Sequence, residues 1–493
     1  MATLGMNKVV MRSLLWIMIP VVTAMSFCGC RSKAATSIET GNDERMIVAV
    51  PDSAYAVSVF LNDAGDPINS AGIDFPVGDA KNPAVDPFIT VSSSNTGVVP
   101  NTGLFVSGSG LTRNLKIDPV AAGYATITIT VINGTYRRSY LLNYAVSQAQ
   151  TMKGRSWHNG IADASAAIVI DDDHMLVAND ETNLLYLYNR RLSGMPVRSF
   201  DYNEGNALGL TDSIAGKWKE VDVEAGVRST QDPSIIYWIG SMSNNSSFLN
   251  KPNRNRLFAM RVSGKIAEIK LTNAGYSDQL RRHLVLWGNA HGYNFDSSAA
   301  AGRDCKRPDG FNIEGMVFGP DKRTMYIGFR APLVPLAHRT KALIAPINNF
   351  EKWFNNGSPA GDPQIGAPIE LDLGGRGIRD IICIPDGSYV IIAGSCGAEL
   401  VPAVYTWTGN KNDAPVENNS FELSGLNVEG VVPVYEDGKL LLNKLQVVTD
   451  NGNQIFYGDT VLAKNLPVAN FKKFSSVITE SRKKDNLVPS GKQ

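Results

Sequence analysis

The feature that most constrains how this chain can fold is a short unit that occurs five times between residues 155 and 470. Each copy begins with a turn, continues as an apolar strand of about five residues, turns at a hairpin rich in Asp, Pro or Gly, and returns as a second apolar strand. The copies are DASAAIVIDDDHMLVANDE (163–181), DVEAGVRSTQDPSIIYWIGS (222–241), NIEGMVFGPDKRTMYIGFR (312–330), GIRDIICIPDGSYVIIAGS (377–395) and NVEGVVPVYEDGKLLLN (427–443). Further strand patterns such as NLLYLYNR and LFAMRV fill the intervals, and a recurring four-stranded unit predicts a β-propeller.

The length of this region predicts about six blades. A blade takes roughly 45–50 residues, so residues 155–470 hold six, and long insertions leave five or seven open. Residues 471–493 lack a core pattern and are expected to form a flexible tail.

Residues 46–148 follow a different pattern. Short alternating strands such as FITVSS and ATITITVI are separated by turn clusters, and seven or so of them in roughly 100 residues predict a β-sandwich. The stretch from DPFITVSSSNTGVV to ATITITV resembles bacterial Ig-like and cadherin-like repeats, which implies a spacer or adhesion module. The expected fold class is therefore all-β, with an Ig-like β-sandwich ahead of the propeller.

The N-terminal segment has the pattern of an export signal. A basic stretch precedes the apolar run LLWIMIPVVTAMSF (14–27), which is shorter than a membrane-spanning helix requires. The run ends in Cys-Gly-Cys, and Cys30 after a small residue resembles the lipobox of bacterial lipoproteins. The resemblance implies a signal peptide over 1–29, acylation of Cys30, a tether over 30–45 and attachment to a membrane, which we expect to be a Gram-negative outer membrane. The alternatives are an ordinary secretory signal or a true start at Met6 or Met11.

Composition and motifs exclude several classes of function. The chain has 47 Lys and Arg residues and 47 Asp and Glu residues, so it has no excess of positive charge to bind a nucleic-acid backbone. Beyond the signal, Cys305, Cys383 and Cys396 are too widely spaced for a metal or redox motif, and their disulfide state is left open. No nucleophile elbow, P-loop or His-Glu-x-x-His motif occurs, so the sequence leaves open whether the protein is an enzyme.

Several phrases of the propeller region resemble one family. DASAAIVIDDDHMLVANDETN, YWIGSMSNN with KPNRNRLFAMRV, NIEGMVF with IGFRAPL, and LDLGGRGIRDI occur in this order and resemble the DUF3616 family of bacterial domains. A looser similarity, in the Asp/Asn-x-Glu-Gly opening, is to esterase-like phytase propellers. That similarity implies an acidic cluster that organises a metal ion and a phosphate.

In a propeller, the equivalent residues of all blades lie at one rim of the central channel. The innermost strand of each blade begins at one rim of the central channel, and the next strand returns to it. Residues at the strand openings and just after the return strands should therefore converge. The return strands contribute Asp180, Glu181, Ser241, Ser243, Arg330 and Ser395. Alignment of the openings puts five residues at equivalent places: Ser165, Glu224, Glu314, Arg379 and Glu429.

Three carboxylates brought together repel one another and need a cation, a shared proton or arginine partners. We therefore expect catalytic groups around Ca²⁺ or Mg²⁺ at Glu224, Glu314 and Glu429. Further oxygen ligands are expected from Asp163, Asp222, Asn312 and Asn427. A small anionic substrate is expected on Arg330, Arg379 and Ser243. The predicted reaction is metal-assisted hydrolysis of a phosphoester or similar ester.

Three other interpretations remain open at this stage. The repeated glutamate caps backbone groups or pairs with arginine and has only a structural role. The rim is a non-catalytic module that binds a glycan or a protein. The whole chain is a structural or adhesive envelope protein.

Overall fold

The computed structural model describes residues 45–51, 56–148, 154–355, 358–397 and 400–482. The predicted signal peptide, Cys30 and nearly all of the tether lie outside these residues, as does 483–493 of the predicted tail. Within the described part of the chain, no helix combines the length and the apolarity needed to span a membrane.

Residues 46–148 form two four-stranded sheets. One has the order β1-β3-β6-β5, and the other has the order β2-β8-β7-β4 with β2 and β8 parallel. The strands are β1 (Met46–Val48), β2 (Ala56–Phe60), β3 (Ile73–Asp79), β4 (Phe88–Ser93), β5 (Leu104–Ser107), β6 (Thr112–Ile117), β7 (Gly123–Asn133) and β8 (Tyr136–Ser147), and α1 (Pro67–Ala71) follows β2.

The two sheets share one hydrophobic core. Alternate residues of β7, including Ile127, Ile129 and Val131, are buried and pack in the same cluster as Leu115 of β6. This is the arrangement of a β-sandwich, and the period-two alternation of the sequence is its cause. The finer Ig-like assignment stays a prediction.

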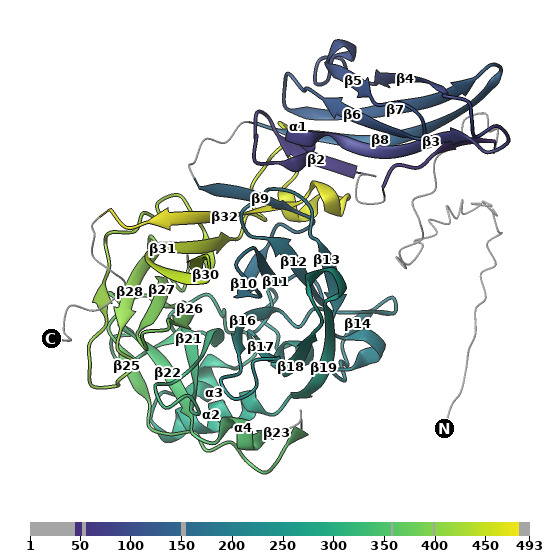
Figure 1. Cartoon of the computed structure of the whole chain (residues 1–493). Helices are drawn as coiled ribbons and strands as arrows, with labels where there is room; N and C mark the ends of the chain where they lie inside the picture. Colours follow the sequence, from purple (N-terminus) through teal and green to yellow (C-terminus); the bar gives the residue numbers. More distant parts are fainter. Residues whose placement is uncertain (1–44, 52–55, 149–153, 356–357, 398–399, 483–493) are drawn as a thin grey trace, which may run out of the picture. The chain divides into compact units, whose positions relative to one another are not determined.

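Residues 155–482 contain five four-stranded antiparallel sheets (Figure 1). The first two are β10 (Ala164–Val169), β11 (His174–Asn179), β12 (Leu184–Asn189), β13 (Arg198–Asp201), and β16 (Val223–Arg228), β17 (Ile235–Gly240), β18 (Leu257–Ser263), β19 (Lys270–Ser277). The next two are β20 (Asn312–Phe318), β21 (Met325–Val334), β22 (Lys341–Ile347), β25 (Ile369–Leu371), and β26 (Gly377–Cys383), β27 (Tyr389–Gly394), β28 (Ala403–Trp407), β29 (Val416–Glu417). The last is β30 (Val428–Glu436), β31 (Lys439–Thr449), β32 (Lys473–Glu480) and β9 (Arg155–Asn159).

Insertions carry the remaining elements. They are α2 (Leu280–Ala290), α3 (Phe295–Ser298), α4 (Phe350–Trp353), and the short pairs β14 (Ser213–Ile214) with β15 (Lys217–Trp218) and β23 (Phe354–Asn355) with β24 (Ser358–Pro359).

The first strands of the five sheets form a closed ring. β10 contacts β16, β16 contacts β20, β20 contacts β26, β26 contacts β30, and β30 contacts β10. A cyclic array of four-stranded sheets is the arrangement of a β-propeller. The described residues make five blades instead of the expected six, because the helices and loops between β19 and β20 and between β22 and β25 take up the length assigned to another blade.

The last blade joins distant parts of the chain. β9 precedes the first blade in sequence but pairs with β32, with Trp157 opposite Ser475. The expectation that residues 471–493 form a flexible tail is therefore wrong for residues 473–480, which are β32 and are mostly buried. The weak apolar pattern of this segment becomes a strand because β31 and β9 supply backbone partners on both sides.

Apolar cores hold neighbouring blades together. Trp238 of β17 is fully buried in one cluster with Leu176 and Leu185 of the first blade. Truncating a buried tryptophan to alanine typically costs about 3–5 kcal/mol. The first two blades thus form a continuous support for the strand ends that face the channel.

Candidate functional site

Each innermost strand carries a β-bulge at the same place, near the channel rim. The pairing register shifts across one residue in all five first strands, and these residues are Ser165, Glu224, Glu314, Arg379 and Glu429. A bulge residue has no single partner opposite it, and bulges redirect side chains beside functional sites. The five aligned positions of the sequence are therefore structurally equivalent.

A cavity of about 490 Å³ lies at this rim. Nine carboxylic acids and four basic side chains line it. They are Asp180, Glu181, Glu220, Asp222, Glu224, Asp304, Glu314, Glu429 and Asp450, with Arg254, Lys306, Arg330 and Lys464. The excess of acids gives the cavity a negative potential that favours cations.

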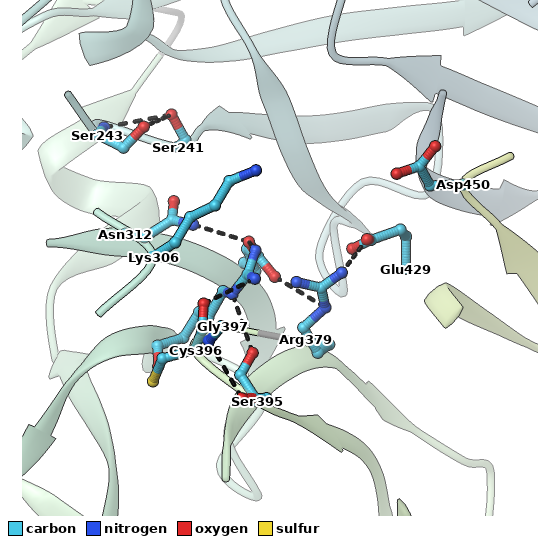
Figure 2. A network of polar contacts seen from close by, with 12 residues as sticks. Ser241, Ser243, Lys306, Asn312, Arg379, Ser395, Cys396, Gly397, Glu429 and Asp450 are labelled. Atoms are coloured by element: carbon cyan, nitrogen blue, oxygen red, sulfur yellow. Dashed lines mark hydrogen bonds and ion pairs between the residues drawn. The ribbon is translucent and has the colours of Figure 1, made fainter. Parts of the chain in front are cut away.

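Glu314 is the centre of a buried ion-pair network, and Figure 2 labels two of its partners, Asn312 and Arg379. Its carboxylate is paired with Arg330 at 2.8 Å and with Arg379 at 3.3 Å, and it accepts a hydrogen bond from the Asn312 amide at 2.8 Å. Arg379 also pairs with Glu429. The three carboxylates expected to surround a cation are thus divided, because arginines already compensate Glu314 and Glu429.

Asp222 belongs to a second paired group. Its carboxylate lies 2.7 Å from Arg254 and accepts a hydrogen bond from the Ser241 hydroxyl. Arg254 also pairs with Glu220 at 3.1 Å and donates to the Ser243 hydroxyl at 3.1 Å. Burial raises the pKa of Asp222 to about 6, although Arg254 opposes the shift.

Glu224 and Asp180 form no such pair, although the charge of Arg379 opposes the pKa shift of Glu224. Among the described residues, neither carboxylate has a hydrogen-bond or ion-pair partner, and one Asp180 oxygen is fully buried. Burial raises the pKa of Glu224 well above its usual range, and Glu314 and Asp222 add to the shift. Burial and the charge of Asp222 do the same to Asp180. These two carboxylates are the ones free to meet a ligand.

A compact acidic group lies at the same rim. Oxygen atoms of Asp163, Asp180 and Glu181 all lie within 4.8 Å of one another. Burial raises the pKa of Asp163 to about 7, with Asp450 and Glu181 adding to the shift. Three carboxylates in this geometry suit a hard divalent cation.

The structure brings most of the predicted residues together. The cavity is lined by seven of them: Glu224, Glu314, Glu429, Arg330, Ser243, Asp222 and Asn312. Arg379 is outside that lining but contacts it through Glu314 and Glu429, and Asp163 lies in the acidic group. Asn427 is exposed, does not line the cavity and donates to Asp450 at 3.0 Å.

Several residues of the cavity were not predicted from the sequence. Asp450 follows the fifth return strand as Asp180 follows the first, so extending the alignment would have found it. Lys306 and Lys464 lie in insertions without a repeat pattern. Figure 2 shows the Lys306 side chain extended, and its amino group has no partner among the described residues.

The three cysteines are free thiols. Cys396 is buried, Cys305 is half-buried at the cavity, and Cys383 is exposed. None of them belongs to the acidic group.

Fold and site together define a propeller-like protein with an acidic pocket at one end of its channel. No protein-family model matches the chain, and no curated protein sequence matches it. The DUF3616 resemblance therefore stays a prediction from the quoted phrases.

Solved structures give distant likenesses. A protein of Bacteroides thetaiotaomicron VPI-5482 named "putative phosphatase" matches at 9% identity over 88% of this chain and 98% of that chain, with a TM-score of 0.26. Virginiamycin B lyase from Staphylococcus aureus matches at 11% identity over 80% and 99%, with a TM-score of 0.24. Domains 1–6 of the surface layer protein SbsC match at 17% identity and a TM-score of 0.18, and the match spans 46% of this chain and only 25% of that one. At these TM-scores the likenesses carry no argument about function.

Proposed function

We propose that the acidic pocket binds a small anionic ligand together with a divalent cation and hydrolyses a phosphoester. The observation that carries this proposal is the pair of uncompensated carboxylates, Asp180 and Glu224, in a cavity that also contains the unpaired Lys306. The Asp180 carboxylate attracts a cation, the cation with Lys306 can hold an anion, and Glu224 keeps its proton. Arg330 and Arg379 act as supports, since their charges are used by Glu314 and Glu429.

Glu224 is the proton-transfer group of this proposal. Water forms the new P–O bond, the ester P–O bond breaks, and the leaving oxygen takes the proton of Glu224. The carboxylate then regains a proton from the attacking water. A positioned carboxyl group of this kind contributes typically 10²–10⁴-fold to the rate.

The test is turnover of p-nitrophenyl phosphate and bis-p-nitrophenyl phosphate with Ca²⁺ or Mg²⁺. We expect Glu224→Gln to lower kcat about 100-fold or more. The matched control is Glu220→Gln, which removes another acid of the same cavity that is paired with Arg254 and should keep activity. Equal turnover by wild type and Glu224→Gln would refute hydrolysis at this site.

A second candidate is cation-dependent binding of a glycan without turnover. One wall of the cavity consists of Ser243, Asn244, Asn245 and Ser246 with the partly exposed ring of Phe248. Hydroxyl and amide groups beside an aromatic ring suit sugar recognition. Saturable glycan binding that Phe248→Ala abolishes, in a protein that hydrolyses no ester, would favour this candidate.

We further propose that the protein is a lipoprotein of the cell envelope. An acyl chain on Cys30 would hold it in the outer membrane, and the sandwich, as an Ig-like spacer, would carry the propeller. The lipobox-like Cys-Gly-Cys after the apolar run and the short polar tether support this view.

A further inference from the structure

In the first, second and fifth blades, the residue directly before the first strand and the residue directly after the second strand are both polar. In the second blade, Asp222 at the strand opening accepts a hydrogen bond from Ser241, the residue after the return strand. In the fifth blade, Asn427 donates to Asp450 at the same two positions. In both blades one member is a donor and the other is an acceptor.

The first blade departs from this rule. Ala164 pairs with Asn179. Asp163 directly precedes Ala164 and Asp180 directly follows Asn179, so they occupy the same two positions, but both are carboxylates. Glu181 adds a third. Neither aspartate can donate a hydrogen bond when ionised, so the positions that are satisfied internally in the other two blades are left with negative charge alone.

Burial makes this charge costly. Asp163 is only 7% exposed, and its carboxylate has no hydrogen-bond or ion-pair partner in the part of the chain that the structure describes. One oxygen of Asp180 is completely buried and likewise unpartnered. Buried carboxylates of this kind are normally paired or coordinate a metal ion.

The neighbouring charges leave the three carboxylates available. Asp450 accepts one hydrogen bond on each carboxylate oxygen, from the Gly452 backbone and from Asn427. Lys472 donates to the carbonyl oxygen of Lys464, and neither lysine forms an ion pair with the three. Their positive charges lower the pKa of Asp163 but do not outweigh its burial.

We propose that Asp163, Asp180 and Glu181 form a Ca²⁺ site at the edge of the pocket. The oxygen separations, all within 4.8 Å, suit Ca²⁺, whose ligands at ~2.3–2.6 Å can lie up to about 5 Å apart. Mg²⁺ binds its ligands at ~2.0–2.1 Å and needs a tighter octahedron. All three ligands are carboxylates, without His or Cys, which disfavours Zn²⁺ and the softer metals.

This inference deepens the proposed function, because the cation that the function requires would be the Ca²⁺ held here. It also places the cation apart from Glu314 and Glu429, where arginines already supply the positive charge.

The test is calorimetric titration of the chelator-treated protein with CaCl₂ alone and with MgCl₂ alone. We expect one Ca²⁺ per chain and weaker Mg²⁺ binding. Asp163→Asn reproduces the Asn–Asp pair of the fifth blade, so it should fold normally and bind Ca²⁺ about tenfold more weakly or not at all. Glu181→Gln, on an exposed residue, should also weaken binding, and Glu220→Gln should leave it unchanged.

Absence of Ca²⁺ binding by the wild type, equal binding by Asp163→Asn, or tighter binding of Mg²⁺ would each overturn the proposal. The experiment distinguishes failure of the metal site from failure of the proposed hydrolysis. Ca²⁺ binding without turnover refutes hydrolysis and leaves the metal site, whereas turnover without Ca²⁺ binding refutes the metal site and leaves hydrolysis.

Discussion

Replacing Glu314 by glutamine separates the structural carboxylates of the rim from those free to act on a ligand. Glu314 is 1% exposed and compensates two guanidinium groups, those of Arg330 and Arg379, which are themselves buried. Glutamine keeps an oxygen that can accept from Arg330 but places an NH₂ group or a neutral oxygen against Arg379. The substitution therefore leaves two buried positive charges with only Glu429 as a carboxylate partner.

The expected loss of stability follows from the number of buried charges that lose a carboxylate partner. Removing one partner of a buried ion pair costs about 3–5 kcal/mol, because the remaining charge is left uncompensated. Arg330 keeps hydrogen bonds to the backbone oxygens of Ser395 and Cys396, and Arg379 keeps Glu429, so we expect about 3 kcal/mol for Glu314→Gln.

Glu224→Gln is the matched control, since Glu224 occupies the equivalent bulge in the second blade. Its carboxylate has no partner among the described residues, and its raised pKa shows that the charge is disfavoured. We therefore expect glutamine at this position to leave the stability unchanged or to raise it.

Urea unfolding followed by tryptophan fluorescence measures both variants. No tryptophan lies between residues 46 and 148, so the signal comes from tryptophans outside the sandwich, although Trp157 also stacks on Phe60 of the sandwich. The midpoint should fall for Glu314→Gln and stay or rise for Glu224→Gln, with an unchanged slope. Equal losses in the two variants would refute the division of the carboxylates into paired and unpaired groups.

Three further predictions concern other parts of the chain. Burial raises the pKa of Asp380 from 3.8 to about 7, so the folded state binds this proton more tightly than the unfolded state does. The stability that the bound proton contributes is fully present below pH 3.8 and is lost as the pH rises through about 7. The urea midpoint should therefore fall as the pH rises over this range, and the fall should be smaller in Asp380→Asn. An equal fall in the wild type and in Asp380→Asn would contradict a raised pKa at Asp380. Gly377→Ala would place a methyl group against the carbonyl oxygen of Arg330, and we expect a loss of about 2 kcal/mol or more in the same assay, whereas wild-type stability would show that the two blades can move apart. Cys30→Ser should release the protein from the membrane fraction and abolish labelling by a fatty-acid analogue; retention of both would rule out acylation at this residue.

The repeats were enough to predict the blades and the meeting of their polar residues. The strand–turn–strand unit is a local pattern, and its period dictates which residues point into a core and which begin a strand at the rim. The alignment of Ser165, Glu224, Glu314, Arg379 and Glu429 follows from that period, and the five bulges occupy these positions. The sandwich alternation was predictable for the same reason.

The blade number and the closure of the ring were not predictable in this way. An insertion of helices and loops has the same length as a blade, so length alone suggested six. β32 and β9 are far apart in sequence, and their pairing is a long-range contact that neither segment's own pattern encodes.

By itself, the sequence determined that polar side chains from several blades meet at one end of a ring, because side-chain periodicity is a property of each strand. Only the tertiary structure decided which charges compensate one another. Glu314 and Glu224 have the same local sequence context, yet Glu314 lies between two arginines, whereas Glu224 has no hydrogen-bond or ion-pair partner among the residues that the structure describes. The difference arises because Coulomb interactions act through space between residues from different blades, and no local pattern specifies them.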